Sequence, residues 1–312
     1  MLVTHNRSKF LCLALKSIMQ QTLLPDEIII IDDASKTPVL KEIVDIIELC
    51  KALDIRIKIF RTKNEVGLGA ARSIGARRAS GKYIVFIDDD AIASKQLIES
   101  YINMFKKKRC KIIAGPCYPL YLSEYKLPNW WDEQVLGGLI AVRNDLTYMS
   151  KRTWNPADYV FGCNFAIDKN VLESLRGFKP WLGRVRGMLL SGEEWDFVSR
   201  ALSKGFKVCF SGSAFIYHII PPSKITIKRM MRMCVDMGRT RCILAHERVF
   251  NKSLSIYFIY CAIAVFKDLI EAVINMLMLN EPKTMKKIYD SALHLNTILL
   301  CKDTIHKLRS IK

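Results

Sequence analysis

Residues 27–33 read EIIIIDD and residues 82–90 read KYIVFIDDD, and these two stretches decide the fold. Each is a short apolar run that ends in adjacent aspartates. Strands that are apolar on both faces are typical of a sheet covered by helices on both sides. Because the carboxyl ends of parallel strands meet at one edge of a sheet, both aspartate clusters are expected where ligands bind in such folds.

The flanking sequence alternates short apolar runs with helical patterns in which apolar residues recur every three or four positions. Strands are predicted over 27–31, 55–60, 82–87 and 111–115, and helices over 9–21, 39–53, 67–80 and 94–107. This alternation predicts an α/β fold with a mainly parallel, Rossmann-like sheet flanked by helices. The predicted domains are 1–221, with halves 1–117 and 118–221, and a basic helical extension over 222–312.

Composition limits the possible classes of protein. The 312 residues are 50% hydrophobic, which excludes disorder as the main state, and their 48 basic and 30 acidic side chains give a net charge of +18. That charge favours polyanions such as nucleic acid, nucleotides or an anionic membrane. Ten cysteines without any C-x-x-C pair predict reduced thiols and no zinc site or disulfide framework. The start turns polar after three residues, unlike a signal peptide, so a cytoplasmic location is expected.

The basic charge is concentrated near the end of the chain. Residues 223–312 hold 16 Lys and Arg against 7 Asp and Glu. Their most apolar run, 254–266, is shorter than the roughly 20 residues that cross a bilayer, and Lys267, Asp268 and Glu271 follow it. The pattern favours an amphipathic helix at an anionic membrane surface over a span. The alternative is a helical appendage that packs on the enzyme core.

Three adjacent carboxylates at Asp88, Asp89 and Asp90 predict a cation site. They raise each other's pKa unless a cation neutralises them. Carboxylate oxygens suit Mg²⁺ or Mn²⁺, which complete their coordination with phosphate and water. A metal-bound phosphate ester is therefore expected. For Asp32 and Asp33 a strand-ending turn or a helix cap is an equally good interpretation.

Other side chains have a functional and a structural interpretation. Residues 64–81, NEVGLGAARSIGARRASG, place Arg72 on a glycine-rich helix, where it can bind phosphate, although small residues there also suit close packing on a sheet. Glu193 and Glu194 open a predicted helix. A desolvated carboxylate there can act as a general base, but acids in a first turn commonly only complement the helix dipole. His218, after a predicted strand, is a candidate metal ligand or a hydrogen-bonded surface residue.

In this order the motifs resemble glycosyltransferase family 2, the inverting, nucleotide-sugar-dependent group with the GT-A fold. The resemblance covers about the first 220 residues. It rests on T-x-N-R at 4–7, Q-T-x-x-P-x-E at 21–27, DDAS at 32–35, N-x-x-G at 64–67, AR at 71–72, Gly75, DDD at 88–90, G-x-N at 162–164, GF at 177–178 and GEE at 192–194. Three features depart from the family pattern: the first strand is short, Ser73 stands where Asn is usual, and Glu194 stands where Asp is commoner.

The resemblance implies a role for each matching residue. Glu194 would be the general base, and Asp33 would accept a hydrogen bond from the nucleotide base. The implied donor-nucleotide residues are Thr4, Arg7, Asp33, Arg72 and Asp88; the implied metal ligands are Asp88, Asp90 and His218; the implied acceptor or sugar contacts are Asn164, Glu193, Trp130 and Trp131. Core packing is an alternative for the tryptophans, including Trp154.

The expected function is an inverting, Mn²⁺- or Mg²⁺-dependent glycosyltransferase that uses a nucleoside diphosphate sugar, with UDP as the expected nucleotide. The expected acceptor is a hydroxyl of a glycan or lipid-linked molecule in cell-surface polysaccharide or glycoconjugate synthesis, at the cytoplasmic membrane face. A nucleotidyltransferase on a similar sheet is an alternative, although residues 4–9 lack its usual glycine-rich loop. A basic nucleic-acid-binding module is another, but the basic residues form no recognisable reading motif, so no nucleic-acid partner is expected.

Overall fold

The computed structural model describes residues 1–122, 126–143, 157, 160–184, 188–247 and 254–309. The chain forms two compact units. Unit 1 comprises Met1–Leu120, Ala141–Pro180 and Glu193–Ile219, and unit 2 comprises Tyr121–Ile140, Trp181–Gly192 and Ile220–Lys312. The predicted division of function at residues 117 and 221 stays a prediction.

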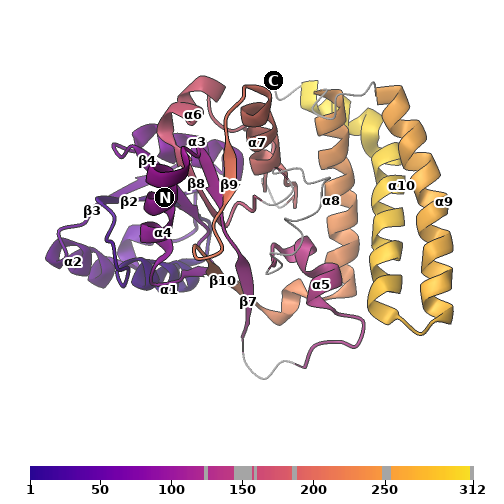
Figure 1. Cartoon of the computed structure of the whole chain (residues 1–312), viewed down its shortest axis with the longest axis horizontal. Helices are drawn as coiled ribbons and strands as arrows, with labels where there is room; N and C mark the ends of the chain where they lie inside the picture. The colour runs from indigo at the N-terminus through magenta and orange to yellow at the C-terminus, as the bar shows by residue number, and fades with distance from the viewer. Residues whose placement is uncertain (123–125, 144–156, 158–159, 185–187, 248–253, 310–312) are drawn as a thin grey trace. The chain divides into compact units, whose positions relative to one another are not determined.

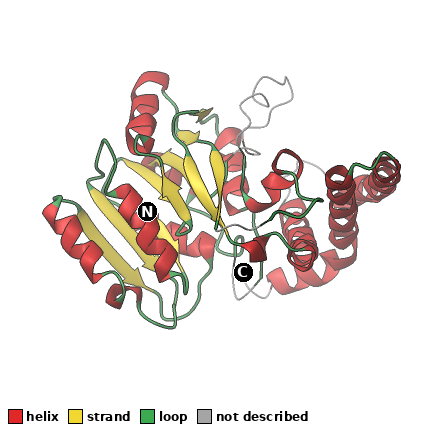
Figure 2. Ribbon diagram, turned by 90° about the horizontal axis from the view of Figure 1, so that it is seen from below, coloured by secondary structure: helices red, strands yellow, loops and turns green. Residues whose placement is uncertain are grey.

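Unit 1 is built on strands that follow the predicted apolar runs closely. β1 (Leu2–Thr4), β2 (Glu27–Asp32) and β3 (Arg56–Arg61) pair in parallel, with Thr4 opposite Asp32. Ile28 to Ile31 of β2 are all buried, as expected of a strand that is covered on both faces. Helices lie on both sides of the strands in Figure 2.

A second sheet of unit 1 is mixed. Its order is β4–β8–β6–β9, with bounds β4 (Tyr83–Ile87), β6 (Ile112–Ala114), β8 (Asn164–Asp168) and β9 (Val208–Phe210). β8 is antiparallel to both of its neighbours, whereas β6 and β9 are parallel. The parallel arrangement predicted for the first half therefore holds for β1–β3, and β8, which follows the irregular region, adds antiparallel pairs.

A third sheet places the end of the α/β region beside the aspartate cluster. Its order is β5–β10–β7, with bounds β5 (Ala91–Ala93), β7 (Cys117–Tyr121) and β10 (Ile216–Ile220). β5 follows the aspartates directly and pairs antiparallel with β10, so that His218 lies opposite Ala91. This register carries His218 to the aspartates although 128 positions separate it from Asp90.

The helices of unit 1 confirm the predicted periodicity. They are α1 (Ser8–Ile18), the 3-10 turn η1 (Val39–Lys41), α2 (Val44–Ala52), α3 (Leu68–Arg78), α4 (Leu97–Lys108), α6 (Lys169–Leu175) and α7 (Glu193–Ser203). On α3 the absence of a side chain at Gly75 allows close approach, because a Cβ there would lie 3.2 Å from Ile31 Cγ1 and would overlap Met1. Part of the glycine-rich stretch therefore serves helix-to-sheet packing.

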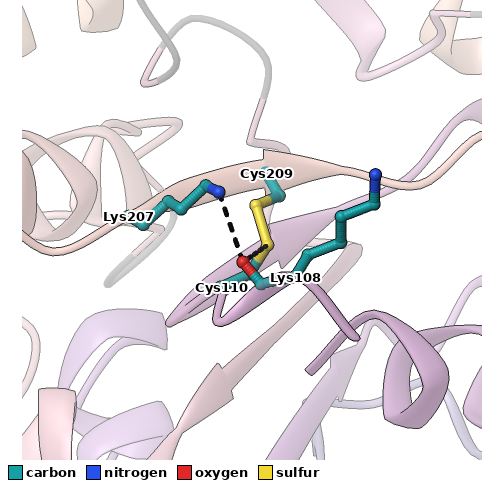
Figure 3. The surroundings of a disulfide bond; sticks show 4 residues. All are labelled: Lys108, Cys110, Lys207 and Cys209. Atoms are coloured by element: carbon teal, nitrogen blue, oxygen red, sulfur yellow. Dashed lines mark hydrogen bonds between the residues drawn. A yellow bond between two sulfur atoms is a disulfide. The ribbon is translucent and has the colours of Figure 1, made fainter. Parts of the chain in front are cut away.

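One pair of cysteines contradicts the prediction of reduced thiols. Cys110, just before β6, and Cys209, on β9, form a disulfide between positions 99 residues apart (Figure 3). The two cysteines meet because β6 and β9 are adjacent parallel strands, a pairing that is absent from any local spacing pattern. Beside them, Lys207 Nζ donates a hydrogen bond of 3.2 Å to the Lys108 carbonyl. The cysteines therefore no longer argue for a reducing compartment.

Unit 2 is helical, as predicted for the end of the chain. It contains α5 (Glu133–Leu136), η2 (Gly137–Ile140), η5 (Pro222–Lys224), α8 (Ile227–His246), α9 (Leu254–Leu277) and α10 (Glu281–Arg309). In Figure 1, α10 lies between α8 and α9. Gly238 lets α8 approach α10, because a Cβ there would lie 2.9 Å from Asn296 Cβ. Among the described residues, no helix combines the length and the apolar character needed to cross a membrane.

Candidate active site

The two aspartate clusters lie together at the ends of their strands in unit 1. Thr4, at the end of β1, donates from Oγ1 to Asp89 Oδ2 across 2.7 Å, and its carbonyl accepts a hydrogen bond from the Asp33 amide. Thr4 is buried. It therefore joins the cluster after β2 to the cluster after β4, rather than presenting its hydroxyl at a surface.

Asp32 and Asp33 organise the loops that surround this edge of the sheet. Asp32 accepts from the backbone amides of Ser35 and Val39, which confirms the turn interpretation for that residue. Asp33 Oδ1 accepts from the Val66 amide and Oδ2 accepts from the Gly67 amide, each across 2.9 Å. Asp33 thus fixes the loop that leads into α3. Each Asp33 oxygen has two lone pairs, so Oδ2 keeps one for a further donor.

The three adjacent carboxylates are neutralised largely by two arginines. Arg7 Nη1 donates to Asp89 Oδ1 across 3.2 Å and to Asp90 Oδ2 across 3.0 Å. Arg72 Nη2 donates to Asp88 Oδ1 across 2.8 Å. Burial raises the pKa of Asp89 to about 7 even though Arg7 opposes the shift. Sequence reasoning gave Asp89 no role of its own, yet its contacts with Thr4 and Arg7 make it the organising member of the cluster.

Asp90 and His218 form a pair of potential metal ligands. His218 Nε2 lies 3.3 Å from Asp90 Oδ1, and the Ile219 amide donates to the Asp90 carbonyl across 2.8 Å, which fixes β10 against the cluster. No group of three or more His, Cys, Asp or Glu side chains among the described residues is arranged to hold a metal ion. Two protein ligands nevertheless fit Mg²⁺ or Mn²⁺, which commonly take their remaining ligands from substrate phosphate and water. The donor set therefore suits a divalent ion that binds together with a nucleotide.

A buried chain of charges connects this cluster to the start of α7. Arg72, the buried residue between them, donates from Nη1 to Glu193 Oε1 across 2.6 Å in addition to its bond to Asp88. Gly162 makes room for this guanidinium, because a Cβ at residue 162 would lie 2.5 Å from Arg72 Nη1. Both arginines that the resemblance implies as donor-nucleotide residues, Arg7 and Arg72, thus bind carboxylates of the protein.

Glu194 lies at the end of this chain of charges. Its Oε1 accepts from the Gly162 amide across 3.3 Å, its Oε2 is buried, and its side chain shares a hydrogen bond with that of Glu193. Burial, and next the charge of Glu194, raise the pKa of Glu193 to about 8. Glu193 thus tends to retain a proton near neutral pH.

Two further predicted site features are occupied inside unit 1. Asn164 donates from Nδ2 to the carbonyls of Pro116 and Ala214, each across 2.9 Å, and accepts from the Tyr101 hydroxyl across 2.7 Å. We therefore keep Asn164 as a positioning residue and propose no sugar contact for it. Ser73, which stands where the family has Asn, accepts from the Phe178 amide across 2.8 Å and so fixes the GF turn.

The predicted aromatic contacts lie in unit 2. Trp131 is buried and donates from Nε1 to the Tyr121 hydroxyl across 3.3 Å, which supports core packing for this side chain. Trp130 is half-buried and packs edge-on against Trp131, with ring centroids 6.0 Å apart. Trp154 lies outside the described residues. Of the two described tryptophans, Trp130 is the more exposed and stays the candidate for a sugar contact.

Comparison with known proteins agrees with this geometry. The model of the family described as Glycosyl transferase family 2 matches residues 1–176. The chain belongs to glycosyltransferase family 2. An uncharacterized glycosyltransferase of Rickettsia conorii is 40% identical over 103 residues, which are 33% of this chain and 16% of that protein. A cholesterol galactosyltransferase of Borreliella burgdorferi is 26% identical over 261 residues, 81% of this chain and 68% of that protein.

Solved structures of glycosyltransferases share the fold. A mannosyltransferase from Pyrobaculum calidifontis in complex with GDP-Man and Mn²⁺ has a TM-score of 0.64 at 14% identity, over 95% of this chain and 85% of that one. TarS 1–349 of S. aureus in complex with UDP has a TM-score of 0.50 at 14% identity, over 98% of this chain and 90% of that one. These likenesses establish a GT-A glycosyltransferase fold with a helical C-terminal region.

Proposed function

We propose that this member of family 2 is an inverting glycosyltransferase that transfers a sugar from a nucleoside diphosphate sugar, with UDP as the expected nucleotide, to a hydroxyl of a glycan or lipid-linked acceptor. One observation carries the proposal. Arg72 links Asp88, beside the potential metal ligands, to Glu193, whose neighbour Glu194 has a buried carboxylate oxygen. A donor-binding end and a potential base are thereby connected through one buried side chain.

Each residue then has a defined task. Glu194 Oε2 removes the proton of the acceptor hydroxyl as that oxygen forms a bond to the anomeric carbon. The bond from the anomeric carbon to the donor phosphate breaks at the same time, and its electrons leave with the nucleoside diphosphate. Asp90 and His218 would hold the divalent ion, which stabilises the charge on the leaving diphosphate when it is bound. Asp33 Oδ2 is proposed to accept from the nucleotide base, with Arg7 and Thr4 fixing the surrounding carboxylates.

The comparisons support a nucleotide-sugar donor and a lipid acceptor as classes. They do not identify the donor or the acceptor of this chain. The mannosyltransferase neighbour binds GDP-Man with Mn²⁺, and the TarS neighbour binds UDP. The Borreliella relative is named for transfer to cholesterol, which is a membrane lipid. A lipid hydroxyl is accordingly the acceptor that we favour, in keeping with the basic charge of residues 223–312 and a place of action at a membrane surface. The chain matches only part of its first relatives, so its activity and substrates remain a proposal.

Thermal unfolding with UDP, GDP, dTDP and CDP, each with and without Mn²⁺, tests the donor. A ligand that binds only the folded state raises the unfolding temperature. We expect a metal-dependent rise with one diphosphate, its loss in Asp90→Asn, and its retention in Asp45→Asn, which changes an exposed carboxylate on α2. No rise with any nucleotide in the native chain would overturn the proposal.

A further inference from the structure

Helix α9 of unit 2 turns its apolar side chains outward. Along its length Ile259, Ile263, Phe266, Ile270, Ile274 and Leu277 recur at spacings of three and four and are 54–75% exposed. Residues at such spacings share one face of a helix. These six residues define the apolar face of α9. A monomer rarely exposes a contiguous apolar patch of this extent unless the patch binds a partner or a membrane.

The acidic residues of α9, Asp268 and Glu271, point the other way, toward α10. Asp268 is buried, and Lys287 of α10 lies 3.2 Å from its Oδ1. The same lysine lies 2.5 Å from Glu271 Oε2. His294 of α10 lies 3.7 Å from Asp268 Oδ2. A helix at a water-exposed surface normally shows the opposite arrangement, with charges outward and apolar residues inward. The polarity of α9 is therefore that of a helix whose outer side faces an apolar medium.

The apolar surface continues past the end of the helix. Met278 and Leu279, in the turn that leads to α10, are 75% and 89% exposed. A helix-to-helix interface with a second copy would cover a stripe along the axis, but it would leave such a turn in water. A bilayer surface can take up both the stripe and the turn, because it imposes no register on the residues that enter it.

Charge also selects the partner. Residues 223–312 carry an excess of nine basic side chains, and Lys267, whose side chain is 73% exposed, lies beside Phe266 on the outer part of α9. Two copies with the same positive charge repel each other. An anionic lipid surface attracts that charge, and a lysine next to a membrane-embedded stripe can extend its ammonium to the phosphates.

We propose that the apolar face of α9, continued by Met278 and Leu279, lies in the interfacial region of an anionic lipid bilayer and holds the enzyme at that surface. The proposal deepens the proposed function, on which its role in acceptor delivery rests, because a lipid hydroxyl is reached only at a membrane. Because the acidic side of α9 pairs with α10 and only the opposite side is apolar, we place the helix along the surface, where its 24 residues extend about 36 Å at about 1.5 Å of rise per residue.

Vesicle flotation of the full chain tests this surface. We expect the native protein to float with phosphatidylcholine vesicles that contain phosphatidylglycerol, to float less with pure phosphatidylcholine, and to lose binding as salt rises. The variant Phe266→Ser/Ile270→Ser/Leu277→Ser should lose at least tenfold in vesicle affinity. Its matched control is Leu40→Ser/Val44→Ser/Leu49→Ser, which removes three exposed apolar side chains of unit 1 and should bind as the native chain does.

Three results separate the possible explanations. Native protein that binds neither vesicle, or an α9 variant that binds as well as the native chain, would overturn the membrane proposal. A native dimer in sedimentation equilibrium that the α9 variant converts to a monomer, without vesicle binding, would assign the face to a second copy instead. Nucleotide-induced thermal stabilisation is measured in parallel: if it persists while vesicle binding fails, the docking proposal fails and the transferase proposal stands.

Discussion

Arg72 Nη1 donates to Glu193 Oε1 across 2.6 Å, and the two side chains are only 2% and 3% exposed. The two residues lie 121 positions apart, on α3 and α7. A buried contact between a guanidinium and a carboxyl group gains stability only when its hydrogen bonds are well formed, because both groups have lost their hydration. The second bond of Arg72, to Asp88, completes that requirement and ties the helix that carries Glu194 to the aspartate cluster.

Removing Arg72 should strongly destabilise the protein. Arg72→Met removes the guanidinium that donates to both Glu193 and Asp88, and we expect a loss of about 3–5 kcal/mol in the free energy of unfolding, measured with urea. The double variant Arg72→Met/Glu193→Met should lose less than the single variant, since it removes both buried polar groups of the pair. If the double variant loses as much free energy of unfolding as Arg72→Met and Glu193→Met lose in sum, the two side chains are not energetically coupled.

Glu194→Gln should remove turnover but leave nucleotide binding intact. The amide has nearly the shape of the carboxylate but cannot accept the proton of the acceptor hydroxyl, so the rate of transfer should fall by about 10²–10⁴-fold. Release of the nucleoside diphosphate measures the rate, and thermal stabilisation by the same nucleotide measures binding. Glu173→Gln, an exposed position on α6, is the matched control. An active Glu194→Gln protein would show that another group is the base.

The protonation of Glu193 predicts how stability depends on pH. Burial, together with the charge of Glu194, raises the pKa of Glu193 from 4.5 to about 8 in the folded state. The folded protein then holds more protons than the unfolded chain between these values, so the contribution of Glu193 to stability is present below pH 4.5 and is lost as pH rises through 8. Glu193→Gln should lose this dependence, by up to about 1 kcal/mol per pH unit relative to the native chain. Parallel slopes for both proteins from pH 5 to 8 would contradict the assignment.

Local patterns predicted the elements but not the contacts between them. The apolar runs before Asp32 and Asp88 located β2 and β4, because a strand buried on both faces must be apolar throughout. The same aspartates were recognised as a cluster, because strand ends converge at one edge of a sheet. Both inferences need only the sequence around each residue.

The partners of Glu193, Cys110 and Asn164 needed the folded chain. Arg72 is 121 positions from Glu193, Cys209 is 99 positions from Cys110, and Tyr101 is 63 positions from Asn164. No spacing pattern encodes such contacts, since they depend on which strands become neighbours. Arginine is rarely buried in proteins. The glycine-rich context of Arg72 therefore suggested a phosphate contact and not a contact with a carboxyl group of the protein. The one sequence signal that pointed to Glu193 as the partner of Arg72 was the acidic first turn of α7.

The disulfide between Cys110 and Cys209 should stabilise unit 1. In the chain-entropy account, a bond that closes a loop of this length restricts the unfolded chain strongly, and loss of such a bond typically costs about 2–4 kcal/mol. We expect Cys110→Ser/Cys209→Ser to unfold at lower urea concentration than the native chain, and dithiothreitol to lower the stability of the native chain alone. Cys12→Ser, which changes a free and half-buried cysteine, is the control. Equal stability of the native chain with and without dithiothreitol would contradict the prediction.

Gly162 should not tolerate a larger residue without a shift of the site. Its backbone amide donates to Glu194, and a Cβ at this position would overlap the guanidinium of Arg72, which Asp88 and Glu193 hold in place. Gly162→Ala must therefore displace Arg72 or the loop that carries the amide, and overpacking of this kind costs about 1–3 kcal/mol. Gly81→Ala is the matched control, because its nearest neighbour would be the Tyr83 carbonyl at an ordinary 3.4 Å. Urea unfolding should separate the two variants by at least about 1 kcal/mol, and turnover should fall in Gly162→Ala alone. If Gly162→Ala is as stable and active as Gly81→Ala, the position of Arg72 does not depend on the space that Gly162 provides.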